Sequence, residues 1–349
     1  MQNNKIIFSK NILFVITLCV GTIFCCVSCK EKNPLKINIS NINLSIEVVR
    51  FDKDIASIKN NTDDIYKQID KISEKYPVFF DIYNDLIIGI DDIENNLYPE
   101  YLKTFLNDYA VVEAMKNVEK VFPNVNNINK ELSYCFKHIK YYYPDYEIPE
   151  FLAFVGGYKY SIISHESYTG IGLDKYLGTD CKYYDLLDVP MFSKIEMTPE
   201  QIPVDVIKNI AENKYEYYSE TDNLLNKMIY NGKILYFVDA MMPDFDEARK
   251  NKYTQEQLNF CKHYEKKLWA YLIENKLLFT TDYLTIKKLT DNAPYTSYFG
   301  QDSPPRIANW LGLQIVKSYM KHHKNISLKE LMEDENYQKI LNLSKYAPK

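Results

Sequence analysis

The sequence predicts an α+β protein that is mostly α-helical and holds a small antiparallel β meander near its middle. Apolar residues recur at three- and four-residue spacing before about residue 143 and again after residue 190, as in amphipathic helices. Between them, residues 149–178 hold short apolar runs separated by glycine turns, which is typical of strands. No glycine- or serine-rich linker interrupts the chain, so we expect one domain over residues 45–349.

The first residues have the features of an export signal. Lys5 and Lys10 precede an uncharged apolar run that begins at Ile12. A basic start, a short apolar run and small residues before a cleavage site are typical of secretory signal peptides. The run is shorter than the ~20 residues of a membrane-spanning helix, so a short membrane anchor is the less favoured alternative.

The run ends in Cys26-Val27-Ser28-Cys29, which resembles a bacterial lipobox, although Cys26 replaces the usual leucine. In such a motif the last cysteine is acylated and becomes the first residue of the mature protein. We therefore predict a signal peptide over residues 1–28, lipid attachment at Cys29 and a lipidated tether over residues 29–44. Each acyl chain contributes about 0.8 kcal/mol per buried CH₂, so lipid is expected to hold the exported protein on a membrane.

The charge balance argues against a nucleic-acid partner. The 349 residues carry a formal net charge of −5, and loss of Lys5 and Lys10 with the signal peptide leaves the mature chain near −7. Proteins that bind nucleic acid usually carry a basic patch. Only Cys135, Cys181 and Cys261 remain in the domain, which allows at most one disulfide and offers no Cys-x-x-Cys spacing for zinc.

The first half of the domain is expected to be helical after one strand. Residues 46–52 mix β-branched and charged residues and predict a strand, on which Arg50 and Asp52 would share the face opposite Phe51. From about residue 60 to residue 143 the apolar spacing is that of amphipathic helices, and Asn, Asp and Thr clusters offer helix caps.

The meander is expected to contain three strands, over residues 151–155, 158–164 and 170–174. The connections between these runs are short, and Gly156-Gly157 is a turn signal. Parallel neighbours need a crossover connection of a dozen or more residues. We therefore predict that consecutive strands pair in antiparallel fashion.

Helices are expected again in the last part of the chain. The apolar spacing predicts helices over residues 224–242 and 256–275. A nearly all-apolar run that starts at Ile307 predicts a buried helix capped by residues 302–305. Gly312 within this run suggests a close contact with another backbone.

No motif for catalysis or cofactor binding is present. A helical zinc peptidase needs His-Glu-x-x-His, whose spacing places both imidazoles on one helix face. The pair His165-Glu166 has no second histidine after it, and His322-His323 would diverge by ~100° on a helix. Nucleophile elbows, phosphate-binding loops and dinucleotide fingerprints are missing as well. The sequence therefore predicts no catalytic residue, no cofactor and no metal.

Arginine is rare in this chain, where Arg50, Arg249 and Arg306 stand beside many lysines. When lysine is so strongly favoured, an arginine suggests a planar, two-pronged contact that lysine cannot make. We consider a buried carboxylate such as Asp174 as the partner of Arg306.

Three stretches, together with the lipoprotein signal, resemble the gliding-motility lipoprotein GldB family of Bacteroidetes. They are Arg50-Phe51-Asp52, residues 171–178 (IGLDKYLG) and residues 305–316 (PRIANWLGLQIV). The similarity spans nearly the whole chain. It implies a cell-envelope lipoprotein needed for surface gliding, associated with the machinery that exports and drives surface adhesins, and it implies no established catalytic activity.

The order of predicted elements also resembles, more faintly, predicted zinc peptidases that carry His-Glu-x-x-His. In those proteins the first helix after the meander carries the histidines, and a later helix supplies a glutamate ligand. Here the corresponding helix, residues 204–212, has no histidine, and Asn231 stands where the glutamate is expected. Loss of these ligands removes the metal and its activated water. A zincin-like domain in this chain would therefore be a degenerate copy.

We therefore expect a non-enzymatic, lipid-anchored envelope protein that binds or supports other components of the gliding and adhesin-secretion machinery. The alternatives are a zinc peptidase with unrecognised ligands and a surface module that binds glycan or peptide in a tyrosine-lined groove. Lys30-Glu31-Lys32 is less acidic than the same stretch of surface-exported lipoproteins, which favours the periplasmic face of the outer membrane. The candidate structural or binding residues are Arg50, Asp52, Asp174, Arg306 and Trp310.

Overall fold

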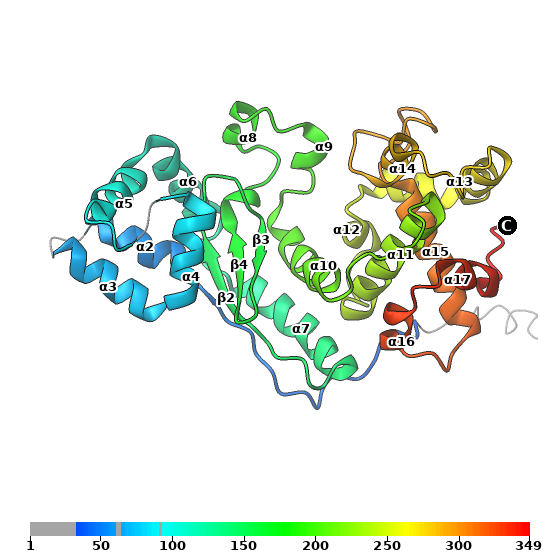
Figure 1. The fold of residues 1–349 in the computed structure, drawn as a ribbon, viewed down its shortest axis with the longest axis horizontal. Coiled ribbons are helices and arrows are strands. Elements are labelled where there is room, and N and C mark those ends of the chain that lie inside the picture. The colour runs from blue at the N-terminus through cyan, green and yellow to red at the C-terminus, as the bar shows by residue number, and fades with distance from the viewer. Residues whose placement is uncertain (1–32, 61–63, 91–92) are drawn as a thin grey trace, which may run out of the picture. The chain divides into compact units, whose positions relative to one another are not determined.

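A four-stranded mixed sheet with helices around it forms the main part of the chain (Figure 1). The computed structural model describes residues 33–60, 64–90 and 93–349, so Cys29 and the predicted signal peptide lie outside the described residues. Residues 37–349 form one compact unit, and residues 33–36, the described end of an N-terminal unit, form a turn. The predicted α+β class is confirmed. Among the described helices, none is long and apolar enough to span a membrane.

The first helices of the unit pack around one aromatic core. The ring of Phe51 lies edge-on to the rings of Tyr76, Phe79 and Tyr83, with centroids 4.9 to 5.2 Å apart. All four side chains are buried, and burial of such rings is the main stabilising term in a core. These helices are α2 (Phe51–Asn60), α3 (Ile65–Lys75), α4 (Pro77–Ile82), the π-helix η2 (Tyr83–Ile88), α5 (Tyr98–Asn107) and α6 (Tyr109–Val121). Helix α7 (Asn126–Tyr142) follows them.

The first strand is shorter than the sequence predicts. Strand β1 covers only Val48–Val49, and helix α2 begins at Phe51. Asp52 and Asp54 occupy the first helical turn, where negative charge favours a helix over a strand because it offsets the positive end of the helix dipole. The prediction that Arg50 and Asp52 share a strand face was therefore wrong.

The sheet has the strand order β1-β2-β4-β3. Strands β2 (Glu150–Phe154) and β4 (Tyr168–Gly172) pair in parallel, and only β3 (Ile162–Ser164) pairs with β4 in antiparallel fashion. The prediction of an all-antiparallel meander was therefore wrong. Strand β3 runs opposite to β2, as predicted, but β4 lies between the two strands and is parallel to β2. Neighbouring strands lie only about 4.8 Å apart, so the connection over residues 155–161 passes across one strand position.

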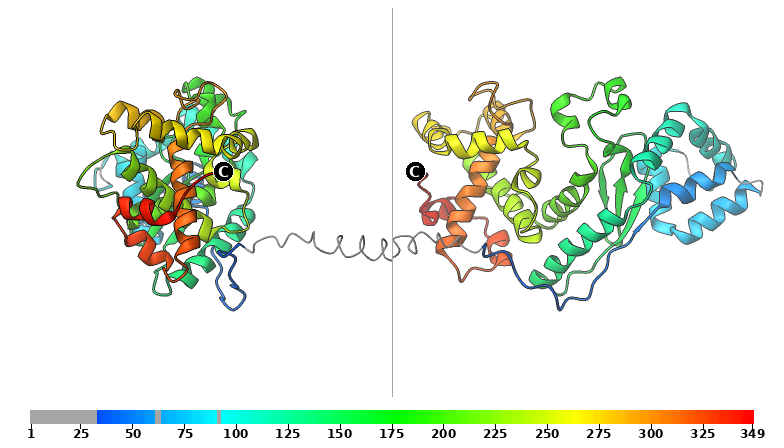
Figure 2. Two further views of the ribbon diagram at one scale, coloured as in Figure 1. Left: turned by 90° about the vertical axis from the view of Figure 1, so that its right-hand side faces the viewer. Right: turned by 180° about the vertical axis from the view of Figure 1, so that it is seen from behind.

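Helices cover both faces of this sheet, with α2 and α4 on one side and α7 and α10 (Ile202–Lys214) on the other (Figures 1 and 2). Phe154 packs on Phe79 of α4 at a centroid distance of 6.2 Å, and Phe151 packs on Phe136 of α7 at 5.1 Å. A strand that is buried on both faces is apolar throughout. This explains the unbroken apolar run at the start of the meander.

Two long helices of the last part, α11 (Leu224–Met241) and α15 (Ile307–His322), cross at glycines. A Cβ on Gly312 would lie 1.9 Å from the carbonyl oxygen of Met228, and a Cβ on Gly232 would lie 2.3 Å from the carbonyl carbon of Gly312. The predicted close backbone contact at Gly312 is confirmed.

The N-terminus of α15 differs from the prediction, because residues 302–305 do not cap it. Arg306 takes the N-cap position in the left-handed conformation, with a φ of 56° and no side-chain cap. The other elements of this part are η3 (Leu173–Lys175), α8 (Lys182–Leu186), α9 (Met191–Lys194), η4 (Pro199–Gln201), α12 (Glu247–Asn251), α13 (Gln255–Glu274), α14 (Tyr283–Thr290), α16 (Leu328–Glu333) and α17 (Tyr337–Ser344).

Candidate functional site

Arg50 and Asp52 form a structural pair at the start of α2. The Nε and Nη2 atoms of Arg50 donate to the two carboxylate oxygens of Asp52 at 2.8 and 2.7 Å. The Nη1 atom donates to the backbone oxygen of Phe122 at 2.6 Å, which joins the first turn of α2 to the residue that follows α6. The two-pronged arginine contact that the sequence suggested is present here. Its role is architectural.

Arg249 makes a second contact of the same kind. Its Nη1 and Nη2 atoms donate to the carboxylate of Glu131 at 3.1 and 2.7 Å, and its Nε donates to the backbone oxygen of Glu200 at 2.7 Å. These bonds connect α12 to α7 and η4.

Asp174 is fully buried in the turn that follows β4. Its Oδ2 atom accepts hydrogen bonds from the backbone N–H groups of Gly156 and Tyr158 at 3.1 and 2.7 Å. Burial raises the pKa of Asp174 from 3.8 to about 6, because the charged form loses its hydration. Asp174 therefore fixes the turn after β2. The expectation that it pairs with Arg306 was wrong.

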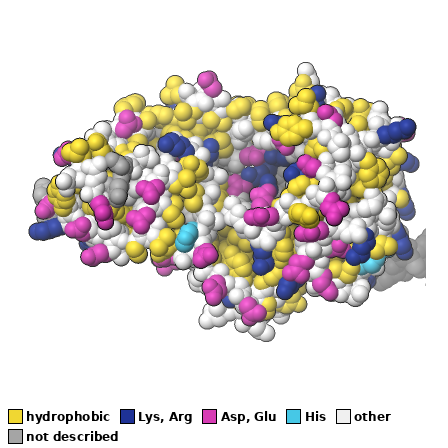
Figure 3. All heavy atoms as spheres, in the orientation of Figure 1, with side chains coloured by type: hydrophobic (Ala, Val, Ile, Leu, Met, Phe, Trp, Pro, Cys, Tyr) yellow, Lys and Arg dark blue, Asp and Glu magenta, His cyan; other side chains and the backbone are white. Residues whose placement is uncertain are grey.

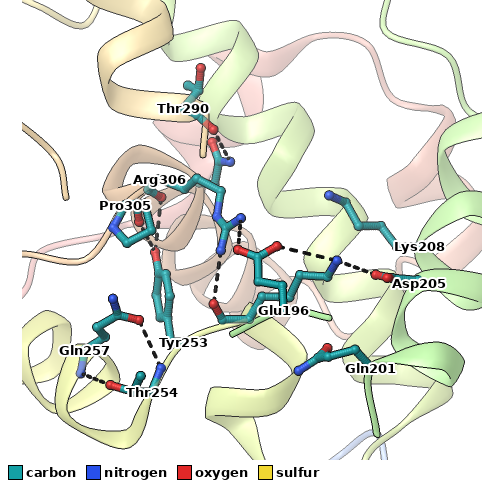
Figure 4. Close-up of polar contacts among 12 residues, drawn as sticks. Glu196, Gln201, Asp205, Lys208, Tyr253, Thr254, Gln257, Thr290, Pro305 and Arg306 are labelled. Atoms are coloured by element: carbon teal, nitrogen blue, oxygen red, sulfur yellow. Dashed lines mark hydrogen bonds and ion pairs between the residues drawn. The ribbon is translucent and has the colours of Figure 1, made fainter. Parts of the chain in front are cut away.

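Arg306 pairs instead with Glu196, between α9 and η4 (Figure 4). The Nη1 atom of Arg306 lies 2.8 Å from Glu196 Oε1, and Lys252 Nζ lies 3.7 Å from the other oxygen. Lys252 also lies 2.5 Å from Oδ1 of Asp205 on α10, and the hydroxyl of Tyr176 donates to Oδ2 of Asp205 at 2.9 Å. We call Glu196, Asp205, Lys252 and Arg306 the four-charge cluster. Two cations and two anions make it neutral.

Two members of the four-charge cluster have strained backbones. Lys252 and Arg306 have φ values of 54° and 56°, in the left-handed region that costs a residue with a Cβ roughly 1–2 kcal/mol. The Nη2 atom of Arg306 donates to the backbone oxygen of Lys252 at 3.1 Å, and Tyr253 donates to the backbone oxygen of Pro305 at 2.8 Å. Such strain concentrates at functional sites, where the surrounding contacts hold it in place.

A cavity of about 40 Å³ lies beside the four-charge cluster. Lys208 of α10 and Asn231 of α11 both line it, so the two helices that the peptidase resemblance singled out meet here. Asn231 Nδ2 donates to Oδ1 of Asn309 at 2.9 Å, and Asn309 Nδ2 donates to the backbone oxygen of Thr290 at 2.9 Å. The lining residues are Lys208, Asn231, Ile234, Leu235, Lys250, Asn251, Lys252, Tyr253, Arg306 and Asn309.

Trp310 fills the core behind this cavity. Its side chain is buried, and its Nε1 atom finds no acceptor among the described residues. In the described part of the chain, no group of three or more His, Cys, Asp or Glu side chains is arranged to hold a metal ion.

Two stretches are rich in tyrosine, residues 183–184 and 215–218, and several of their side chains pack against other parts of the chain. Tyr184 is fully buried, and Tyr217 packs against the rings of Tyr230 and Tyr337 at 5.1 and 6.1 Å. A groove of about 410 Å³ runs between α7 and η4, and its lining includes one tyrosine, Tyr134, and no tryptophan. These positions do not form the tyrosine-lined groove that a glycan-binding module needs.

Sequence reasoning did not single out Glu196, Asp205, Lys208 or Lys252. Glu196 and Arg306 are 110 residues apart, so no local spacing connects them. Asp205 and Lys208 are three residues apart on α10, but an acid and a base at this spacing are common on solvent-exposed helices. Only the tertiary structure shows that Asp205 belongs to the four-charge cluster and that Lys208 lines the cavity.

The fold and this site define an α+β protein that carries a neutral, partly buried ion cluster beside a small polar cavity. Over residues 32–348 the chain matches the family model described as gliding motility protein GldB, and it belongs to that family. The resemblance drawn from the three sequence stretches is thereby confirmed, and the protein is associated with gliding motility. Searches of curated proteins and of solved structures found no match.

Proposed function

We propose that this protein is a non-enzymatic lipoprotein of the gliding machinery that acts by binding another envelope component of gliding or adhesin secretion. A lipid on Cys29 would hold it on the outer membrane with the described unit in the periplasm. The observation that supports this function best is the four-charge cluster, in which each acid is already paired with a cation.

A carboxylate that accepts several hydrogen bonds from cations and hydroxyls has fewer lone pairs left for a metal, a water or a substrate proton. Here Glu196 contacts Arg306 and Lys252, and Asp205 contacts Lys252 and Tyr176. The cluster therefore holds three separate chain segments in a fixed arrangement. Fixed polar geometry of this kind suits recognition of a partner better than proton transfer.

The metal content of the full-length protein tests this proposal. The lipoprotein is purified in detergent, loaded with excess zinc, dialysed and measured by elemental analysis beside the Glu196→Gln variant. We expect far less than one zinc per chain in both samples. One zinc per chain in the wild type, lost in the variant, would establish the peptidase alternative and overturn the proposal.

A further inference from the structure

The wall of the 40 Å³ cavity is rich in hydrogen-bond donors and contains no carboxylate. Four of its lining residues are cationic and three are asparagines. Ammonium and guanidinium groups only donate, and the amide nitrogens donate as well. Each of the four cations also contacts a carboxylate outside the lining, so the cavity offers the remaining N–H donors, which suit a group with several acceptor atoms. The cationic residues are Lys208, Lys250, Lys252 and Arg306, and the asparagines are Asn231, Asn251 and Asn309.

The nearby acids do not use up these donors. Glu196 and Asp205 contact Lys252 and Arg306 but do not belong to the cavity lining. An ammonium group carries three N–H donors and a guanidinium group carries five, so hydrogens remain for a second acceptor. Glu196 also demonstrates, within the chain, that Arg306 and Lys252 hold a carboxylate between them.

Lys208 is the cavity cation that is freest to engage a ligand. Its contact with a carboxylate is to Glu212, one turn along α10, at 3.6 Å, and its side chain is 39% exposed. By contrast, the side chain of Lys250 is 8% exposed and lies 2.7 Å from Asp239. Figure 4 shows the ammonium group of Lys208 extending toward the space beside Arg306.

Asn251 of the cavity lining is held from outside the cavity, because its Nδ2 atom donates to the backbone oxygen of Glu247 at 2.8 Å. Asn251 is 6% exposed, and its Oδ1 atom receives no hydrogen bond from the described residues. A water takes about 30 Å³, so the volume suits one carboxylate-sized group. In the space-filling view, acidic and basic side chains gather in a hollow between α10 and α12 (Figure 3).

We propose that this cavity binds a carboxylate of a polypeptide, either its free C-terminus or an acidic side chain. Lys208 and Arg306 supply charge-assisted hydrogen bonds to the carboxylate, and the amide of Asn231 lies on the same wall. This inference rests on the proposed function only in taking a polypeptide as the ligand. A zinc-loaded protein would overturn the proposed function, whereas failure of the binding experiment below would overturn carboxylate recognition alone.

Three acetylated peptides serve as probes: Ac-Ala-Ala-Ala with a free C-terminus, the same peptide as its C-terminal amide, and Ac-Ala-Asp-Ala amide. Their binding to the full-length lipoprotein in nanodiscs is measured by saturation-transfer NMR titration. We expect at least one carboxylate peptide to bind saturably and the neutral amide not to bind. The peptide that binds more tightly identifies the source of the carboxylate. Equal signals from all three peptides would overturn the proposal.

Lys208→Gln locates the binding site, and Lys214→Gln on the same helix is the matched control, because Lys214 is exposed and does not line the cavity. Loss of one charge-assisted hydrogen bond should weaken binding of the carboxylate peptide about fivefold or more in Lys208→Gln. Lys214→Gln should bind like the wild type. Unchanged binding in Lys208→Gln, or equal weakening in both variants, would overturn the assignment to this cavity.

Discussion

The start of α2 and the start of α15 lie in different surroundings. Around Phe51, buried rings pack edge to face, whereas around Arg306 two acids and two bases form ion pairs beside a cavity. Replacing a buried ion cluster with apolar side chains is often neutral or stabilising, so such a cluster is weak evidence for stability. The aromatic core is therefore expected to supply more of the stability than the four-charge cluster, and the recognition proposed above would give the cluster a role other than stability.

The largest effect is expected from Phe51→Ala, which removes the centre of the aromatic core. Phe51 is fully buried, and large-to-small changes at such sites cost about 3–5 kcal/mol because they lose contacts and leave a cavity. Urea unfolding monitored by circular dichroism gives the value. Tyr109→Ala, at a side chain that is 74% exposed, should change stability by about 0.5 kcal/mol or less. A loss below 1 kcal/mol in Phe51→Ala would show that this core is not the source of stability.

Asp174, in η3, is a fully buried acid. Its folded pKa, about 6, lies above the ordinary 3.8, so its contribution to stability is present at low pH and is lost as the pH rises through about 6. The stability of the wild type relative to Asp174→Asn should therefore fall by about 2 kcal/mol between pH 4 and pH 7. Parallel unfolding curves at five pH values measure this difference. A constant difference would contradict the conclusion that burial outweighs the two backbone hydrogen bonds to Asp174.

Gly312→Ala tests the close crossing of α11 and α15. In an open helix, alanine would stabilise by about 1 kcal/mol relative to glycine. Here the added Cβ meets the carbonyl oxygen of Met228, so we expect a loss of about 2 kcal/mol instead. Asn213→Ala, at an exposed helical position, serves as the control in the same urea titration and should stay near the wild type. A gain in stability for Gly312→Ala would rule out the close approach of α11 and α15.

The smallest effect is expected from Arg50→Lys. Lysine keeps the charge but cannot make both bonds to Asp52 and the bond to Phe122, so a loss of about 1 kcal/mol is expected. Lys53→Arg, at a half-exposed neighbour, controls for the exchange of the two residue types. The measurement is the urea midpoint of both variants. No loss in Arg50→Lys would mean that the two-pronged geometry is unimportant here.

The sequence was informative where structure depends on nearby residues. The helical spacing, the buried run of α15, the close contact at Gly312 and the two-pronged contact of Arg50 all follow from local pattern or residue type. The insertion of β4 between β2 and β3 does not, because a short connection permits either pairing.

The site was harder to predict than the fold. Its members come from three segments far apart in the chain, and each has an ordinary sequence context. Arg306 was singled out because arginine is rare, but its partner is Glu196 rather than Asp174. Whether Arg306 pairs with Glu196 or with Asp174 depends on tertiary packing, which the spacing of residues in the sequence does not reveal.

We propose above that the cavity beside the four-charge cluster binds a partner during gliding. Gliding speed of cells that carry Lys208→Glu or Lys214→Glu in place of the wild-type protein tests it most directly, once equal abundance and equal melting temperatures are established. The two changes add the same charge to the same helix, and only Lys208 lines the cavity. We expect cells with Lys208→Glu to glide slowly or not at all and cells with Lys214→Glu to glide normally. Equal gliding of the two strains would contradict it.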